Sequence, residues 1–152
     1  MTLRDRPYPA FFGFAALLFI AATLGSDVAA KISVGGVGLG EAITEHAHYA
    51  VTQPIGTVML LAPFILLSWM SASLAKCKGF EKGLGVFILG AFLLMLMYFS
   101  GYQDSQAYMK QRMWTAATLS IGLLPFKSVP LLLICLGLRW LIARKNENVA
   151  KP

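Results

Sequence analysis

A short cluster of charge between two long apolar runs constrains this chain more than any other feature of its sequence. The cluster covers residues 76–82 and reads KCKGFEK. Residues 55–75 before it are twenty-one residues without a charge, and residues 83–101 after it are nineteen. As a helix, each run is about long enough to cross a hydrocarbon core of roughly 30 Å. The pattern predicts a transmembrane hairpin with a basic tip.

Composition extends this interpretation to the whole chain. Hydrophobic residues make up 57% of the 152 residues and charged residues only 13%, with a mean hydropathy of +0.67, whereas about a quarter of the residues in soluble domains are charged. We therefore predict an all-α membrane protein, a four-transmembrane-helix bundle that forms a single polytopic domain over residues 1–152. The predicted transmembrane helices are residues 10–30, 55–75, 83–101 and 128–143, and two half-apolar external segments, 31–54 and 102–127, join them.

The net charge of +6 is distributed unevenly along the chain. The N-terminal tail, the tip at 76–82 and the C-terminal end together carry nine basic and three acidic residues, while the other two connections carry four of each. Because cytoplasmic loops of membrane proteins concentrate Lys and Arg, this asymmetry predicts a protein of the bacterial inner membrane with both termini in the cytoplasm. Membrane topology thus accounts for the net positive charge, and no nucleic-acid partner is expected.

The first apolar run allows two interpretations. A basic start, an apolar stretch and the small residues at 28–30 fit a cleaved secretory signal peptide as well as a helix that stays in place. We favour an uncleaved helix whose outer end reaches Lys31, because the long stem of a lysine can extend towards the headgroups.

The second external segment, 102–127, has an amphipathic pattern at helical spacing. The polar face includes Gln111, Thr115 and Thr118. Pro125 and Pro130 predict a break before the last helix, which would leave Lys127 at the outer interface. The predicted apolar face consists of Met109, Met113, Ala117, Ile121 and Leu124. The sequence therefore predicts an external helix that lies along the membrane or against a partner.

The first external segment contains the only cluster with ligand chemistry, formed by Glu41, Glu45, His46, His48 and Tyr49. On a strand the two imidazoles would share one face and could bind a metal, but on a helix they point about 200° apart. We favour an external patch without metal, with proton sensing or proton transfer as the alternative use. No cofactor is expected, since neither histidine lies inside a predicted membrane run.

These observations favour a non-enzymatic protein that binds another membrane component. It would act as an accessory subunit of a membrane complex, or as an immunity or exclusion protein, with a membrane-protein partner or as a homo-oligomer. The alternative is a small oligomeric transporter or channel subunit for an ion or small solute, with Lys127 as the charge on the path. A lipid-modifying enzyme ranks last, because the sequence offers no nucleophile and no paired acid and base. The candidate partner-binding residues are Glu41, Glu45, His46, His48, Tyr49, Gln111, Thr115 and Thr118.

Overall fold

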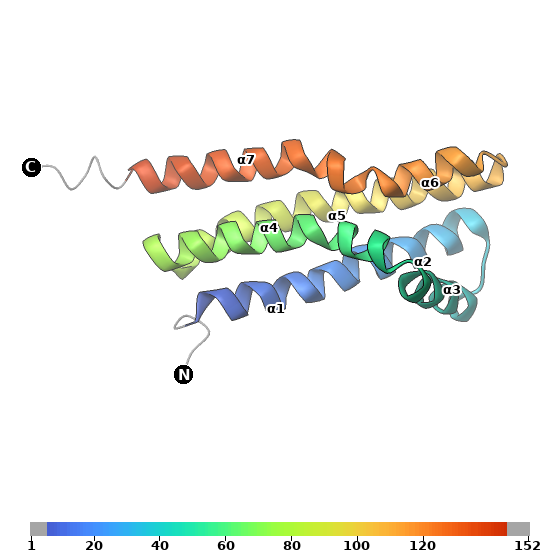
Figure 1. Cartoon of the computed structure of the whole chain (residues 1–152), viewed down its shortest axis with the longest axis horizontal. Coiled ribbons are helices and arrows are strands. Elements are labelled where there is room, and N and C mark those ends of the chain that lie inside the picture. The colour runs from blue at the N-terminus through green and yellow to red at the C-terminus, as the bar shows by residue number, and fades with distance from the viewer. Residues whose placement is uncertain (1–5, 146–152) are drawn as a thin grey trace, which may run out of the picture.

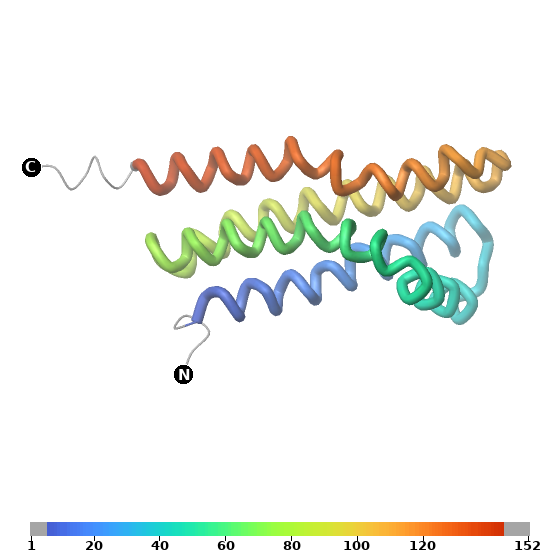
Figure 2. Tube along the Cα trace, viewed as in Figure 1, coloured from blue at the N-terminus to red at the C-terminus, as the bar shows by residue number. Residues whose placement is uncertain are grey.

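The computed structural model describes residues 6–145, and this part of the chain consists of helices joined by short turns, without strands (Figures 1 and 2). The first membrane-length helix, called here the first rod, is continuous from Pro7 to Gly35, although α-helical and π-helical segments alternate along it. It consists of α1 (Pro7–Ile20), the π-helical turn η2 (Ala21–Gly25), α2 (Ser26–Ala30) and a second π-helical turn, η3 (Lys31–Gly35). The remaining helices are α3 (Leu39–Thr52), α4 (Pro54–Lys78), α5 (Phe80–Lys110), α6 (Trp114–Gly122) and α7 (Leu124–Lys145).

Four stretches are long and apolar enough to cross a membrane, as the sequence predicts for a multi-pass protein. They are Pro7–Gly35, Pro54–Lys78, Phe80–Lys110 and Trp114–Arg144. At about 1.5 Å per residue, the 31 residues of Phe80–Lys110 measure about 46 Å, which exceeds a hydrocarbon core of about 30 Å. The longer rods therefore reach beyond the hydrocarbon layer.

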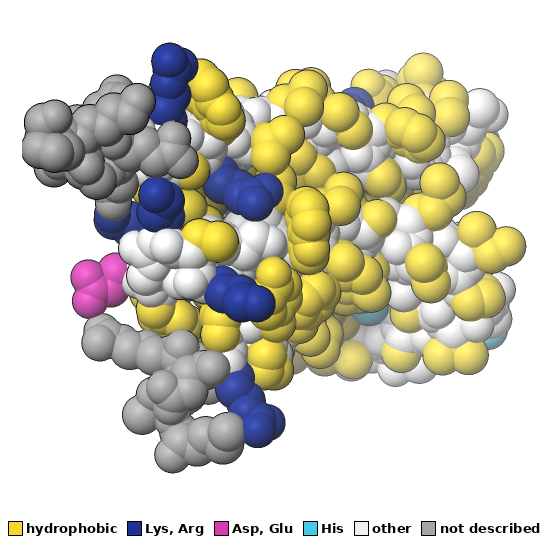
Figure 3. Space-filling model, turned by 60° about the vertical axis from the view of Figure 1, so that its left-hand side comes forward, with side chains coloured by type: hydrophobic (Ala, Val, Ile, Leu, Met, Phe, Trp, Pro, Cys, Tyr) yellow, Lys and Arg dark blue, Asp and Glu magenta, His cyan; other side chains and the backbone are white. Residues whose placement is uncertain are grey.

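The two ends of the bundle differ in composition. The start of α1 and the end of α7 lie together at one end, called here the terminal end, and α3 lies at the other, the α3 end (Figure 1). Dark blue Lys and Arg side chains gather at the terminal end (Figure 3). There, the guanidinium of Arg139 lies 5.7 Å from the centre of the Trp69 ring, a pairing typical of the membrane interface.

The predicted hairpin joins α4 to α5 through Gly79, whose φ of 102° suits glycine and few other residues. Directly after the turn the two helices come very close. A Cβ atom on Gly83 would lie 2.5 Å from the carbonyl oxygen of Ser71 and 2.6 Å from the Cβ of Ala75. Only glycine permits this approach, which is how small residues let membrane helices pack.

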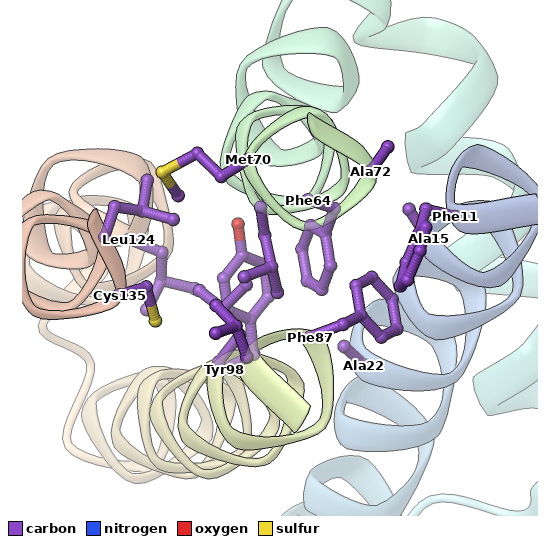
Figure 4. Packing of buried hydrophobic residues seen from close by; sticks show 14 of the residues in the cluster. Phe11, Ala15, Ala22, Phe64, Met70, Ala72, Phe87, Tyr98, Leu124 and Cys135 are labelled. Carbon is purple, nitrogen blue, oxygen red and sulfur yellow. The ribbon is translucent and has the colours of Figure 1, made fainter. Parts of the chain in front are cut away.

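Aromatic rings and hydroxyl groups hold the four rods together (Figure 4). The rings of Phe64 on α4 and Tyr98 on α5 meet edge to face at 5.1 Å, and the Tyr98 hydroxyl donates to the carbonyl of Leu60 at 2.6 Å. On the other side of the bundle, the buried hydroxyl of Ser68 lies 3.2 Å from the carbonyl oxygen of Phe11 on α1. Buried hydrogen bonds to backbone carbonyls thus supplement the apolar packing.

The prediction of one amphipathic helix over 102–127 is wrong. Residues 102–110 continue α5, because Tyr102, Ser105 and Gln106 extend its buried face. The chain then reverses at Arg112, which has a φ of 59°, and α6 returns antiparallel, so that the Ser105 hydroxyl donates to the carbonyl of Ala117 at 3.1 Å. Met109 and Met113 therefore lie on opposite sides of a turn rather than on one helical face.

The predicted start of the last helix at residue 128 is also wrong. Helix α7 begins at Leu124, so Pro125 stands at its start and Pro130 lies inside it. Proline is tolerated in the first turn of a helix, where its missing N–H has no intrahelical partner. The remaining differences are longer spans, since the first rod runs to Gly35 and α5 to Lys110, where the prediction ends at residues 30 and 101.

Candidate functional site

Four ionisable side chains from two segments meet at the α3 end. The ammonium of Lys31 lies 3.0 Å from Oδ2 of Asp27 and 3.1 Å from Oε2 of Glu45. The same Asp27 oxygen lies 2.9 Å from Nδ1 of His46. Because a carboxylate only accepts, Nδ1 of His46 carries the proton in this contact. We call Asp27, Lys31, Glu45 and His46 the ionic cluster.

Burial makes the ionic cluster unusual for a chain with so few charges. The side chains of Asp27 and Lys31 are only 8% and 6% exposed, whereas that of Glu45 is 45% exposed. The lysine forms an ion pair with each of the two carboxylates. Removing one partner from such a buried pair is costly, because the other charge is left without compensation.

Local helix geometry brings the cluster together. Asp27 and Lys31 are four residues apart on the continuous first rod, so they face the same side. Gly36, with a φ of 73°, then ends that rod and lets the chain turn back as α3. On α3, Glu45 and His46 share a face with the fully buried Ala42. The charged face of α3 is therefore the one that meets the bundle.

The exposed surface of α3 carries both apolar and polar side chains. Leu39, Ile43 and Val51 are 59%, 43% and 80% exposed, and Glu41 and His48 are exposed as well. At about 100° per residue, Leu39 projects close to His46, whereas Val51 projects away from Ala42. Helix α3 thus contacts the bundle through charged side chains and leaves several apolar side chains exposed beside them.

Further contacts fix α3 and the end of the first rod. The amide of Gln103 on α5 donates to the Ser33 hydroxyl at 3.3 Å. At its other end, α3 is tied to the first turn of α4, because the Thr57 hydroxyl donates to the carbonyl of Ala50 at 3.2 Å. The cluster therefore lies among elements from three different parts of the chain.

The predicted patch on α3 is divided by the helix. His46 points into the cluster, while Glu41 and His48 are exposed, as expected for two histidines about 200° apart. The exposed ring of Tyr49 has its centre 5.7 Å from the ammonium of Lys31. Within residues 6–145, no three side chains of His, Cys, Asp or Glu are grouped as metal ligands would be.

The other predicted partner-binding residues lie near the α5–α6 turn. Gln111 is in the turn itself, and Thr115 and Thr118 are on α6; all three are exposed. The hydroxyl of Thr118 donates to the carbonyl of Trp114 one helical turn earlier, so its exposed methyl group is free for contact.

Lys127 lies outside the bundle interior, because it is exposed on α7. It follows Leu124 by three residues, and a Cβ on Gly101, the last residue of the uncharged run of α5, would lie 2.6 Å from Cδ2 of Leu124. Lys127 is therefore about one helical turn from the level of Gly101. No carboxylate among the described residues forms an ion pair with it.

Two hollows in the described part of the chain contain no residue of the ionic cluster in their lining. An open groove of about 480 Å³ runs between η2 and α5. Its lining is almost wholly apolar, as expected for a surface that faces lipid. The groove is lined by Ala21, Gly25, Ser26, Phe92, Met95, Leu96 and Phe99. The ionic cluster therefore acts as a clamp between helices rather than as the wall of a substrate pocket.

Asp27 and Lys31 belong to the site although the sequence analysis did not select them. Their spacing of four residues was a usable signal, because opposite charges at i and i+4 pair on a helix. Glu45 and His46 were predicted as part of an external patch, whereas the structure places them against Lys31 and Asp27 of the first rod. No family model, curated protein or solved structure matches this chain.

Proposed function

We propose that this chain is a non-enzymatic, multi-pass protein of the bacterial inner membrane that works by binding another membrane component. It serves as an accessory subunit of a membrane complex, or as an immunity or exclusion protein. The observation that supports this proposal is the exposure of Leu39, Ile43 and Val51 on α3, a helix that the ionic clamp ties to the bundle. Large apolar side chains exposed on one helix at the end of a bundle are suited to contact a partner.

The partner contact is tested by photo-crosslinking in the native membrane. A photoreactive amino acid replaces Ile43, which is 43% exposed on α3, and the matched control replaces Ile88, which is 59% exposed on α5 within a candidate membrane span. The proposal expects one discrete protein adduct from position 43 and mainly lipid adducts from position 88. The Lys31→Met variant, which releases the clamp, should reduce the protein adduct. Lipid adducts alone from both positions would refute a partner at α3.

The orientation belongs to the same proposal. We place both termini in the cytoplasm because nine of the twelve charges in the terminal tails and the tip are basic. A reporter that is active only outside the cytoplasm should give signal when inserted at Glu45 or near Asp104, and none after Lys151. Signal after Lys151 would contradict four crossings with this orientation.

A transporter or channel subunit is the second candidate, and the exposed position of Lys127 on α7 favours it only as an oligomer. Within one subunit the space between the rods is filled by Phe64, Leu67 and Tyr98, each 0% exposed. Reconstitution in vesicles distinguishes the two functions. A solute or ion flux that disappears in Lys127→Met and persists in the exposed control Lys110→Met would establish the transporter.

A further inference from the structure

One contact inside the bundle aligns the ends of α4 and α7. A Cβ atom on Gly90 of α5 would lie 2.5 Å from Cδ1 of Leu67 on α4 and 3.1 Å from Sγ of Cys135 on α7, so these three residues share one level. Lys76 follows Leu67 by nine residues, and Arg144 follows Cys135 by nine as well. Both helices run towards the terminal end (Figure 1). Lys76 and Arg144 therefore lie at a second common level, about 14 Å further on.

Arg139 lies inside this second level and turns towards α4. It precedes Arg144 by five residues, or about 8 Å of helix. Its guanidinium lies 5.7 Å from the centre of the Trp69 ring, and that ring is exposed. Trp69 and Lys76 are seven residues apart and share one face of α4. Arg139 thus lies beside the face of α4 that also carries Lys76.

Helix α1 borders this face on its other side. The hydroxyl of Ser73, which lies between Trp69 and Lys76 on α4, is 3.4 Å from the hydroxyl of Tyr8 on α1. We call the surface formed by Trp69, Ser73, Lys76 and Arg139 the Arg139 surface. It is basic and half-apolar, and it is bounded by helices from three parts of the chain.

The helices around the Arg139 surface contribute no negative charge. As the structure describes them, α1, α4 and α7 contain neither Asp nor Glu, and Arg139 forms no ion pair with a described carboxylate. Its guanidinium stays charged and can donate two parallel hydrogen bonds to one phosphate. The Lys76 stem is about 6 Å long, so one phosphate between them can contact both side chains.

Further into the span the neighbouring surface is apolar. Ile65 and Leu66, about one turn before Trp69 on α4, are exposed, and so is Leu136 on α7. Along the bundle, basic groups at the end of the uncharged run of α4 are thus followed by exposed apolar side chains. A phospholipid has the same order, with a charged headgroup followed by acyl chains.

We propose that the Arg139 surface binds an anionic phospholipid, with the phosphate of the headgroup against Arg139 and Lys76 and the acyl chains along Ile65, Leu66 and Leu136. Charge complementarity supports this occupant, since basic pockets between transmembrane helices bind anionic headgroups. A zwitterionic lipid carries its own positive charge and gains less from a basic surface. The inference goes beyond the proposed function and is independent of it, because α3 lies at the other end of the bundle (Figure 1).

The test measures which lipid lies beside Trp69. Full-length protein with Trp114→Phe and Trp140→Phe keeps Trp69 as its one tryptophan. This parent protein is placed in vesicles of phosphatidylglycerol and phosphatidylcholine. Bromine atoms on the acyl chains of one lipid quench a tryptophan that the lipid contacts. Exchanging the bromine label between the two lipids gives their relative affinity for the surface.

Phosphatidylglycerol should be preferred over phosphatidylcholine about fivefold, which corresponds to about 1 kcal/mol. Arg139→Gln should remove most of this preference. The matched control is Arg144→Gln, which removes the same charge from the same helix at a position about 140° around it, and it should keep the preference. In pure phosphatidylcholine every variant should show the same quenching of Trp69, which verifies that each is folded in the bilayer.

Three results would overturn the proposal. The first is equal affinity of the two lipids in the parent protein. The second is an equal loss in Arg139→Gln and Arg144→Gln, since diffuse surface charge would then explain the preference. The third is a preference that disappears when inorganic phosphate replaces chloride at the same ionic strength, which would assign the surface to a free anion. If Arg139→Gln does not insert, Lys76→Gln decides the matter against the control Lys82→Gln on α5, because only Lys76 belongs to the Arg139 surface.

Discussion

Replacing Lys31 with methionine should release α3 from the bundle. Methionine keeps the apolar stem but removes the ammonium that lies 3.0 Å from Asp27 and 3.1 Å from Glu45. The side chain of Asp27 is only 8% exposed, and His46 would be its one remaining partner that can carry a positive charge. Breaking a buried ion pair by removing one partner typically costs about 3–5 kcal/mol.

The structure points to the lower end of this range of free-energy costs. Glu45 is 45% exposed, so water compensates much of its loss, and an exposed pair contributes about 0–1 kcal/mol. We therefore expect a cost of about 3 kcal/mol, dominated by Asp27, which is roughly a hundredfold change in the equilibrium between docked and undocked α3.

Hydrogen exchange of the α3 backbone amides measures this equilibrium directly. In detergent micelles, the amides of residues 43–50 should exchange about a hundredfold faster in Lys31→Met than in the wild-type protein. The matched control is Glu41→Gln, which removes an exposed charge from the same helix and should leave exchange unchanged. The double variant Asp27→Asn with Lys31→Met should recover part of the protection, because it leaves no unpaired buried charge. Unchanged exchange in Lys31→Met, or a double variant as open as the single one, would refute the clamp.

Two further predictions concern the bundle itself and are measured by reversible unfolding in detergent. Gly83→Ala should destabilise the bundle by about 1–3 kcal/mol, because its Cβ would meet backbone atoms of α4. The control is Gly85→Ala, whose Cβ would meet no atom within 4 Å. This control should stabilise the bundle by up to about 1 kcal/mol through helix propensity. Tyr98→Phe should cost about 1–2 kcal/mol by leaving the Leu60 carbonyl without its donor at 2.6 Å, while Tyr8→Phe removes only a 3.4 Å contact and should have little effect.

The sequence predicts the four apolar spans, though not their bounds, because membrane helices follow from local properties. The length of each uncharged run, the basic residues at its ends and the glycines of α5 can each be read from a short stretch of sequence. The turn at 111–113 was missed for a physical reason. It contains neither Gly nor Pro, and its left-handed residue is Arg112, so the pattern from 102 to 124 gave no signal of a reversal. A periodicity that continues on both sides of a turn is indistinguishable from one long helix.

The ionic cluster could be predicted only in part from short stretches of sequence. The pair Asp27 and Lys31 is readable from its spacing, but its contact with Glu45 and His46 depends on how Gly36 redirects the chain. The helical form of α3 was foreseen as one of two options, and it decides that His46 and His48 separate. Which of the two faces the bundle depends on tertiary packing, which no short window contains.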